Sequence, residues 1–243
     1  MLEVLGLLTV GVVAGVVSTV VSLASIVSYP ALLAFGLNPL AANVTNTVAL
    51  VFTGIGAAAG SRPELQGQGP LVLRLGWITA LGGAAGALLL LITPSRTFET
   101  IAPFLIAIAS VLLIRPPGMR PGGNHSRLTR VALFAVAVYI GYFGAAGGIL
   151  MFAVLTAIMD QAPARVNAVK NVVSGLANCV AAVGFALFGP VAWWAVAPLA
   201  AGFLIGGRLG PSLARRLPGR SLRYLAAACG LAVAVKLGLD AFA

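Results

Sequence analysis

Long apolar runs separated by short polar breaks dominate the chain. The breaks carry proline, glycine or charge, as in Asn38-Pro39, Gln161-Ala162-Pro163 and Gly189-Pro190. Each run is roughly 17 residues or longer, the length of helix needed to cross the hydrocarbon core of a bilayer. The pattern predicts an all-α polytopic membrane protein with about eight membrane segments, at residues 2–35, 40–60, 71–93, 98–114, 129–159, 164–188, 191–214 and 222–243.

The longest polar stretch, at residues 115–128, lies at the middle of the chain and separates membrane regions 1–114 and 129–243. The two regions match at an offset of 124 residues. Pro39 then aligns with Pro163 and Asn43 with Asn167, and the pattern continues in Gly82, Gly83 and Gly86 against Gly206, Gly207 and Gly210. We therefore predict two membrane repeats joined by a polar linker, an arrangement typical of secondary transporters.

Basic residues change sides between the two repeats. Arg62 and Arg74 flank a break whose counterpart at 189–194 is uncharged, whereas the counterpart of Arg96 is rich in arginine, with Arg215, Arg216, Arg220 and Arg223. Because basic loops stay in the cytoplasm, this switch predicts inverted repeats and a cytoplasmic linker at 115–128. The expected location is the cytoplasmic membrane of a prokaryote, as a multi-pass protein.

Two segments favour helices that enter and leave by the same face. Segment 129–159 has glycines at 141, 144, 147 and 148, with about ten apolar residues on either side. Ten helical residues rise about 15 Å, half of the hydrocarbon core. Segment 2–35 has a similar break between Ser18 and Ser25. Each repeat would then hold one re-entrant hairpin and three spans, with both termini outside. The alternative is eight plain spans that obey the charge rule weakly.

Composition excludes two classes of protein. Hydrophobic residues make up 60% of the chain and charged residues 8%, against about 25% charged in a soluble domain, and the mean hydropathy is +1.06. A soluble enzyme and a disordered chain are both excluded. Fifteen basic residues against five acidic ones would suggest nucleic acid in a soluble protein. In a membrane protein this excess orients the loops, so the expected partner is the lipid bilayer and not nucleic acid.

Few residues of the sequence are suited to catalysis. The five acidic residues lie near segment ends or in loops, and the one histidine, His125, lies in the linker. No carboxylate pair for acid–base catalysis and no metal-ligating pattern is present in the sequence. Cys179 and Cys229 lie within apolar segments and are interpreted as packed side chains. We expect no enzyme activity, no cofactor and no bound metal.

Neutral hydrogen-bonding side chains instead mark two helix faces. One face follows Pro163 at spacings of i, i+3, i+4, i+7 and i+11, with the residues Asn167, Lys170, Asn171, Ser174 and Asn178. A related set follows Pro39, with Asn43, Asn46 and Thr47. Polar groups within a bilayer usually face a cavity or a neighbouring helix. The spacing favours a lined pathway, and the alternative is hydrogen bonding between helices.

Lys170 lies seven residues after Pro163, about 10 Å into its helix. It either supplies one positive charge to an anion site or extends outward to the membrane interface. Ser22 and Ser25 add hydroxyl groups near the first break, and Gly147 and Gly148 allow a ligand to approach the backbone at the second. Since the N-terminal ends of half-helices expose N–H groups, these features together indicate a small-anion pathway between the repeats.

Three motifs resemble those of the sulfite exporter TauE/SafE family of membrane permeases. They run from Gly15 through Ser22 and Ser25 to Pro39, from Gly141 to Ile149, and from Gly206 to Leu217. The resemblance covers nearly the whole chain and implies transport of sulfite, thiosulfate or organosulfonates. One departure is Ser22-Leu23-Ala24-Ser25, where the family resemblance leads us to expect a glycine cluster, so the family's substrate does not transfer directly.

The sequence therefore predicts a secondary permease for a small sulfur-containing anion, bound at the repeat interface. The expected binding residues are Ser22, Ser25, Asn43, Asn46, Thr47, Gly147, Gly148, Asn167, Lys170, Asn171 and Ser174. Two alternatives stay open: a non-transporting membrane scaffold or assembly subunit, and a permease for another small oxyanion or a carboxylate. The sequence is also compatible with a homodimer.

Overall fold

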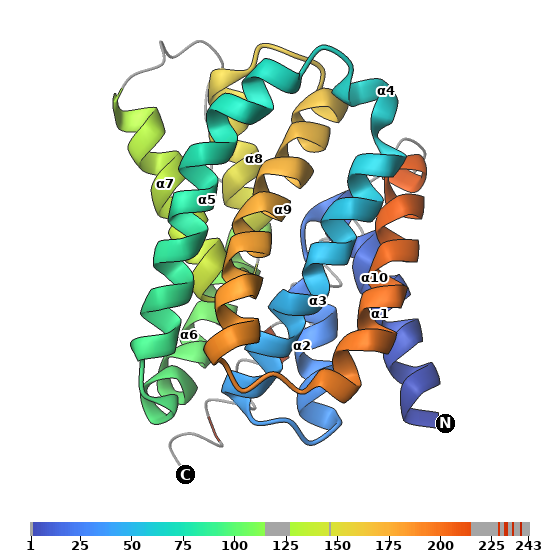
Figure 1. Ribbon diagram of the computed structural model, residues 1–243, viewed down its shortest axis with the longest axis vertical. Helices are drawn as coiled ribbons and strands as arrows, with labels where there is room; N and C mark the ends of the chain where they lie inside the picture. Colours follow the sequence, from blue (N-terminus) through green and yellow to red (C-terminus); the bar gives the residue numbers. More distant parts are fainter. Residues whose placement is uncertain are drawn as a thin grey trace.

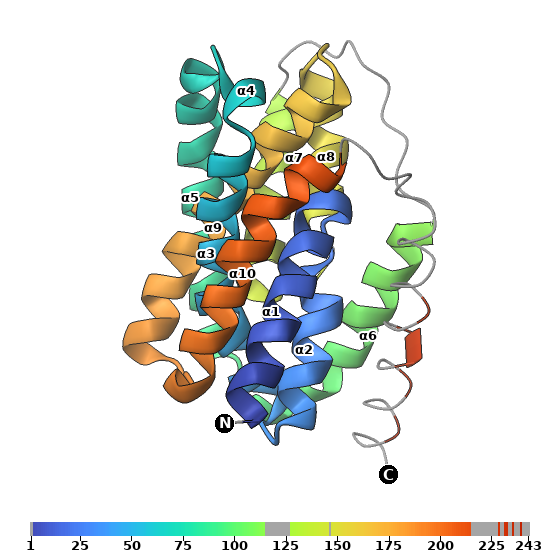
Figure 2. The same ribbon diagram turned by 90° about the vertical axis from the view of Figure 1, so that its right-hand side faces the viewer.

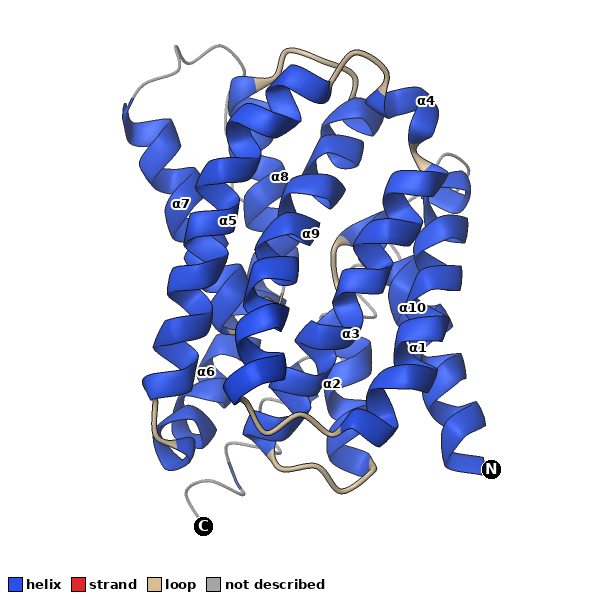
Figure 3. Ribbon diagram, viewed as in Figure 1, coloured by secondary structure: helices blue, strands red, loops and turns tan. Residues whose placement is uncertain are grey.

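The computed structural model describes residues 2–114, 127–145 and 147–214, together with isolated positions between 228 and 239. Within these ranges the chain forms helices joined by short turns, and no described residue lies in a strand (Figure 3). The expectation of an all-α protein is confirmed for this part of the chain. Residues 115–126 of the predicted linker and most of the eighth apolar run lie outside the described residues, as do the arginines at 215, 216, 220 and 223.

The described helices follow the predicted apolar runs. Five of them, α1, α3, α5, α9 and α10, are long and apolar enough to cross a membrane. The helices are α1 (Leu2–Val21), α2 (Ala24–Ala34), α3 (Pro39–Gly60), α4 (Arg62–Leu65), α5 (Gly69–Ile92), α6 (Ser95–Ile114), α7 (Arg127–Tyr142), α8 (Gly147–Ile158), α9 (Pro163–Phe188) and α10 (Trp193–Ala214).

Helix starts agree with the local sequence. Pro39 and Pro163, aligned by the 124-residue offset, both lie at the beginning of a long helix. Proline suits this position because the first N–H groups of a helix have no internal partner. The side chain of Asn38 caps α3 by accepting a hydrogen bond from the backbone N–H of Ala41 at 2.8 Å. The two prolines therefore mark the starts of α3 and α9.

Both segments with predicted breaks are interrupted helices. Ser22, between α1 and α2, has φ +66°, and Gly144, between α7 and α8, has φ +74°. This left-handed conformation ends a right-handed helix, and it is uncommon for a residue other than glycine. The arms after the breaks are short, with 11 residues in α2 and 12 in α8. The arms before them are longer than the ten residues expected, with 20 in α1 and 16 in α7.

The two interrupted helices open toward opposite ends of the bundle (Figure 1). From the N-terminus, α1 runs inward and α2 returns toward the same end, after which α3 crosses to the opposite end and α5 crosses back. The pair α7 and α8 begins and finishes at the end of the bundle opposite the N-terminus. Helices α9 and α10 then cross the bundle in turn. The chain thus enters its second interrupted helix from the opposite side to its first.

Six of the described helices pack in two groups of three, and each group combines helices from both halves of the sequence. One group contains α1, α3 and α10, and the other contains α5, α7 and α9. Helices α3 and α9 join the groups by packing against each other. Figure 2 shows α1 and α10 side by side, although they lie at opposite ends of the described chain. Each sequence half therefore contributes one long helix, α5 or α10, to the group formed mainly by the other half.

Glycines bring the backbones within each group into contact. A Cβ atom placed on Gly15 of α1 would lie 2.9 Å from the backbone nitrogen of Gly207 in α10. In the other group, a Cβ atom on Gly86 of α5 would lie 2.7 Å from the backbone nitrogen of Tyr142 in α7. Small residues permit such close approach between membrane helices. The glycines at 82, 83 and 86 thus let α5 pack closely against α7 and α9. Those at 206, 207 and 210 let α10 pack closely against α1 and α3.

Two asparagines satisfy backbone groups at the interrupted helix ends. The side-chain N–H of Asn167 in α9 donates to the carbonyl of Thr19, in the last turn of α1, at 3.0 Å. Asn43 in α3 donates in the same way to the carbonyl of Tyr142, the last residue of α7, also at 3.0 Å. Carbonyls at a helix end lack a partner within the helix. Each asparagine therefore stabilises the interrupted helix of the other sequence half.

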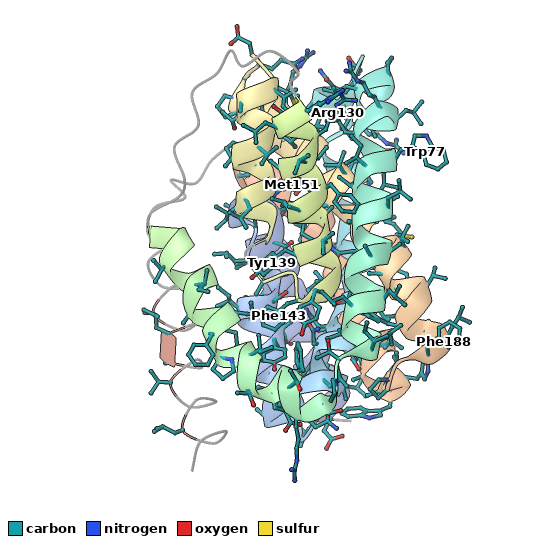
Figure 4. All side chains as sticks on the ribbon, turned by 90° about the vertical axis from the view of Figure 1, so that its left-hand side faces the viewer. Trp77, Arg130, Tyr139, Phe143, Met151 and Phe188 are labelled. Atoms are coloured by element: carbon teal, nitrogen blue, oxygen red, sulfur yellow. The ribbon has the colours of Figure 1, made fainter. Side chains whose placement is uncertain are left out.

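Buried aromatic side chains pack around the second break. The ring centroid of Phe143 lies 5.9 Å from that of Phe98 in α6 and 5.8 Å from that of Tyr29 in α2. The hydroxyl of Tyr139 donates to the carbonyl of Ala145 at 2.7 Å and so bridges the turn. Figure 4 shows Tyr139 and Phe143 on the side of α7 that faces α6. These contacts fix the position of the turn between α7 and α8.

Gly86→Ala should destabilise the protein because the new methyl group would collide with the backbone of α7, which cannot move as a side chain can. Overpacking of this kind costs about 1–3 kcal/mol. The control is Gly184→Ala in α9, where the nearest atom to a new Cβ is 3.8 Å away. In detergent, the melting temperature should fall by several degrees for Gly86→Ala and stay level or rise for Gly184→Ala. Equal melting temperatures for the two variants would contradict close backbone packing at Gly86.

Asn167→Ala should lower stability because it leaves the Thr19 carbonyl without a partner inside the membrane. An unsatisfied buried backbone group costs about 1–3 kcal/mol. Asn178→Ala is the matched control, since it removes an asparagine from the same helix that lies beside a cavity. In detergent, the melting temperature of Asn167→Ala should be clearly lower than that of Asn178→Ala. The opposite ranking would show that the bond to Thr19 contributes little.

Candidate functional site

The two helix breaks meet inside the bundle. A Cβ atom placed on Gly148, in the first turn of α8, would lie 2.7 Å from the Cβ atom of Ser22. Any larger residue at position 148 would therefore push the breaks apart. From the sequence we expect a ligand to approach the backbone at Gly148. In the structure it is Ser22, in the other break, that lies against this glycine.

A cavity of about 60 Å³ lies beside this meeting point. A buried water needs about 10–15 Å³ of such space, so the cavity has room for a few waters or one small ion. Its lining comes from the end of α1, the start of α2, the middle of α3, the break after α7, the start of α8 and one face of α9. The lining residues are Ser18, Ser22, Ala24, Ser25, Leu50, Thr53, Gly54, Ala57, Ile140, Gly144, Gly148, Lys170, Asn171, Ser174, Gly175 and Asn178.

Lys170 supplies the cavity with its charged group. The side chain is 2% exposed, so it does not extend to the membrane interface. Its Nζ atom donates a hydrogen bond to the hydroxyl of Ser22 at 2.6 Å. An ammonium group has three N–H donors, which leaves two beyond the bond to Ser22. Arg208, by contrast, is exposed and does not line the cavity.

Three further polar groups of the lining are buried without a hydrogen-bond partner in the described part of the chain. They are the hydroxyl of Thr53, the side-chain nitrogen of Asn171 and the hydroxyl of Ser174. Thr53 is 5% exposed and Asn171 8%. Buried polar groups are nearly always bonded, and an unbonded group points to a missing water, ion or ligand. Three such groups around one cavity make it the candidate site.

The chemistry of the lining favours an anion. The first turns of α2 and α8 contribute to the wall, and the first N–H groups of a helix have no partner within it. Asn171, Ser174 and Lys170 add side-chain donors. No carboxylate occurs among the lining residues that the structure describes. An arrangement of donors around one cation can bind an oxyanion but offers little to a metal ion, and no cluster of metal-ligating side chains occurs in the described ranges.

The structure brings together six of the eleven residues predicted for the site. They come from both breaks and from the α9 face: Ser22, Ser25, Gly148, Lys170, Asn171 and Ser174. Asn178, at the end of the same face, joins them. Asn167, at its beginning, does not reach the cavity and instead binds the Thr19 carbonyl.

The predicted residues of α3 do not line the cavity: Asn43 and Asn46 bind other helices, and Thr47 bonds within α3. Asn43 binds the Tyr142 carbonyl, and the hydroxyl of Thr47 donates to the Asn43 carbonyl at 2.9 Å. The side chain of Asn46 donates to the hydroxyl of Ser25 at 3.2 Å and accepts from Ser28 at 2.6 Å. Asn46 therefore orients a lining residue without lining the cavity itself.

Gly147 also lies away from the cavity lining. A Cβ atom at this position would lie 2.5 Å from the Ile140 side chain, so the glycine allows α7 and α8 to pack closely.

Thr53 was missing from the predicted site. It lies seven residues after Asn46, and this spacing places both on one face of α3. The face was visible in the sequence, but the position along it that meets the cavity was not.

Comparison with known proteins identifies the family of the chain. The family described as "Sulfite exporter TauE/SafE" matches residues 7–237. The chain is also similar to the "Probable membrane transporter protein ORF9" of a Sinorhizobium species, with 25% identity over 94% of this chain and 89% of that protein. No solved structure matches the chain. Since the family match spans nearly all of the sequence, the chain belongs to the sulfite exporter TauE/SafE family of membrane transporters.

Proposed function

We propose that this transporter carries a small sulfur-containing oxyanion, namely sulfite, thiosulfate or an organosulfonate, through the cavity at the helix breaks. One observation carries the proposal: a buried lysine and three unpartnered polar groups surround the cavity where the two breaks meet. The family of the chain and the printed name of its Sinorhizobium relative support transport as the activity.

The proposed roles follow from the donors that remain free. Lys170 would compensate the charge of the anion through the N–H groups that Ser22 does not use. Asn171 and Ser174, on the same helix face, would donate to anion oxygens, as would Thr53 from α3. Ser25 would act from the first turn of α2, oriented by Asn46. Such donors replace the water that the anion loses when it leaves solution.

The transport cycle in this proposal uses inverted repeats. The equivalent helix starts at Pro39 and Pro163, the opposite directions of the interrupted helices and the reciprocal bonds of Asn43 and Asn167 support two repeats related by inversion. Each repeat would have one re-entrant pair and three spans. Because α5 and α10 are exchanged between the packing groups, we propose that the moving bodies are these groups rather than the sequence halves.

The orientation in this proposal follows from the arginines. Among the described residues, six lie near the end of the bundle opposite the N-terminus, whereas Arg96 lies at the N-terminal end. The positive-inside rule then puts the arginine-rich end, and with it the start of α7 after the linker at 115–128, in the cytoplasm of a prokaryotic cell. The six arginines are Arg62, Arg74, Arg127, Arg130, Arg165 and Arg208.

Flux of radiolabelled sulfite into proteoliposomes tests the proposed substrate and site. We expect flux with the natural chain and at least a tenfold loss in Lys170→Ala, because the variant removes the one charged group among the lining residues that the structure describes. Arg165→Gln is the matched control, since it removes a positive charge from an exposed position on the same helix. Its flux should remain close to that of the natural chain.

The variants are compared at equal amounts of folded protein, established by size-exclusion chromatography. Full flux in Lys170→Ala would overturn the role of the lysine. Absence of flux with sulfite, thiosulfate and organosulfonates alike, under any gradient, would overturn the proposed substrate class. An imposed membrane voltage adds a further readout, since uncompensated anion movement should follow the voltage.

Accessibility of single cysteines tests the proposed orientation. The background is Cys179→Ala with Cys229→Ala, and the reporters are Ser95→Cys at the N-terminal end of the bundle and Arg62→Cys at the other. In intact cells, a membrane-impermeant maleimide should label Ser95→Cys but not Arg62→Cys. Permeabilised cells should give labelling of both. The reverse pattern in intact cells would invert the assignment of the cytoplasmic side.

A further inference from the structure

We propose that the cavity selects oxyanion head groups with a single negative charge and rejects dianions of the same size. This inference rests on the proposed function and narrows it. It favours hydrogensulfite and organosulfonates, which carry one charge, over thiosulfate and sulfate, which carry two.

The first step is the charge of the cavity wall. Lys170 is the one ionisable side chain among its described lining residues, and the remaining polar side chains are serine, threonine and asparagine. The closest arginine along α9, Arg165, is exposed and lies five residues earlier. Solvent screens charges at such positions. The side chains of the wall therefore supply a single positive charge.

The second step concerns the helix ends. The N-terminal end of a helix behaves as a partial positive charge and the C-terminal end as a partial negative one. Each break brings both kinds of end together, since α1 ends where α2 begins and α7 ends where α8 begins. Their contributions oppose each other, so the breaks add no net charge to the site. The charge available to balance an anion remains that of Lys170.

The third step is the balance with the anion in place. A monoanion and the Lys170 ammonium together are neutral, whereas a dianion leaves one negative charge without a partner. Uncompensated charge in a site shielded from water is strongly unfavourable. Lys170 and Asn171 are buried, so water is kept from the groups that would bind the anion. Charge alone should therefore separate anions that have the same shape.

The remaining groups of the lining suit a sulfonate. The donors at Thr53, Asn171 and Ser174, which have no partner in the described part of the chain, can bind the three oxygens of a sulfonate together with the free N–H groups of Lys170. Leu50, Ala57 and Ile140 add apolar surface to the lining, and this surface suits the carbon substituent of a sulfonate.

Methanesulfonate and sulfate test the inference, because both are tetrahedral and they differ by one charge and by a methyl group in place of an oxygen. Binding of each to the purified transporter is measured by isothermal titration calorimetry at equal ionic strength. We expect methanesulfonate to bind at least tenfold more tightly than sulfate. Arg165→Gln is the control and should keep the same ratio.

A second variant changes the charge of the cavity. Asn178→Lys adds a second cation at a partly exposed position of the lining and should shift the ratio toward sulfate. Lys170→Gln should lose binding of methanesulfonate. Equal or tighter binding of sulfate by the natural chain would overturn the inference, and so would no binding of methanesulfonate. Sulfite flux measured on the same preparation then decides separately whether the proposed function stands.

Discussion

Two interrupted helices place backbone carbonyl and N–H groups inside a bundle of apolar helices, where each such group needs a partner from the protein or a trapped water. Much of the arrangement follows from how these groups are satisfied. Asn167 and Asn43 bind carbonyls at the ends of α1 and α7, and Tyr139 bonds across the second turn. Each asparagine belongs to the sequence half that does not contain the carbonyl it binds, so the interruption also holds the two halves together.

Residues of the first turns of α2 and α8, namely Ala24, Ser25 and Gly148, line the cavity on the other side of the same breaks. Gly148 allows the two breaks to touch at Ser22, which brings both helix starts to one place. The lysine on α9 binds the same serine. The cavity therefore lies where the two breaks meet, and three side-chain groups of its lining have no partner in the described part of the chain.

Exchange of α5 and α10 between the packing groups affects how such a transporter can move. Glycine contacts along α1 and α10, and along α5 and α7, join helices from different halves of the sequence through their backbones. Such contacts resist sliding, whereas the contact between α3 and α9 is made at Gly54 and Gly175, where a Cβ atom would lie 3.3 Å from the facing Cα atom. This contact lies beside the cavity, since Gly54 and Gly175 are both among its lining residues.

Local periodicity determined much of this protein. Apolar run length identified the membrane class, glycine and serine clusters located both breaks, and helical spacing placed Lys170, Asn171 and Ser174 on one face. The family motifs were also readable without coordinates. Tertiary structure decided which positions along each polar face line the cavity. On α3, Asn43 and Asn46 bind other helices and Thr53 meets the cavity. On α9, Asn167 binds the Thr19 carbonyl, whereas Lys170, Asn171 and Ser174 meet the cavity. Spacing specifies the direction of a side chain relative to its own helix, whereas its partner, Ser22 for Lys170, is set by packing with a segment 148 residues away.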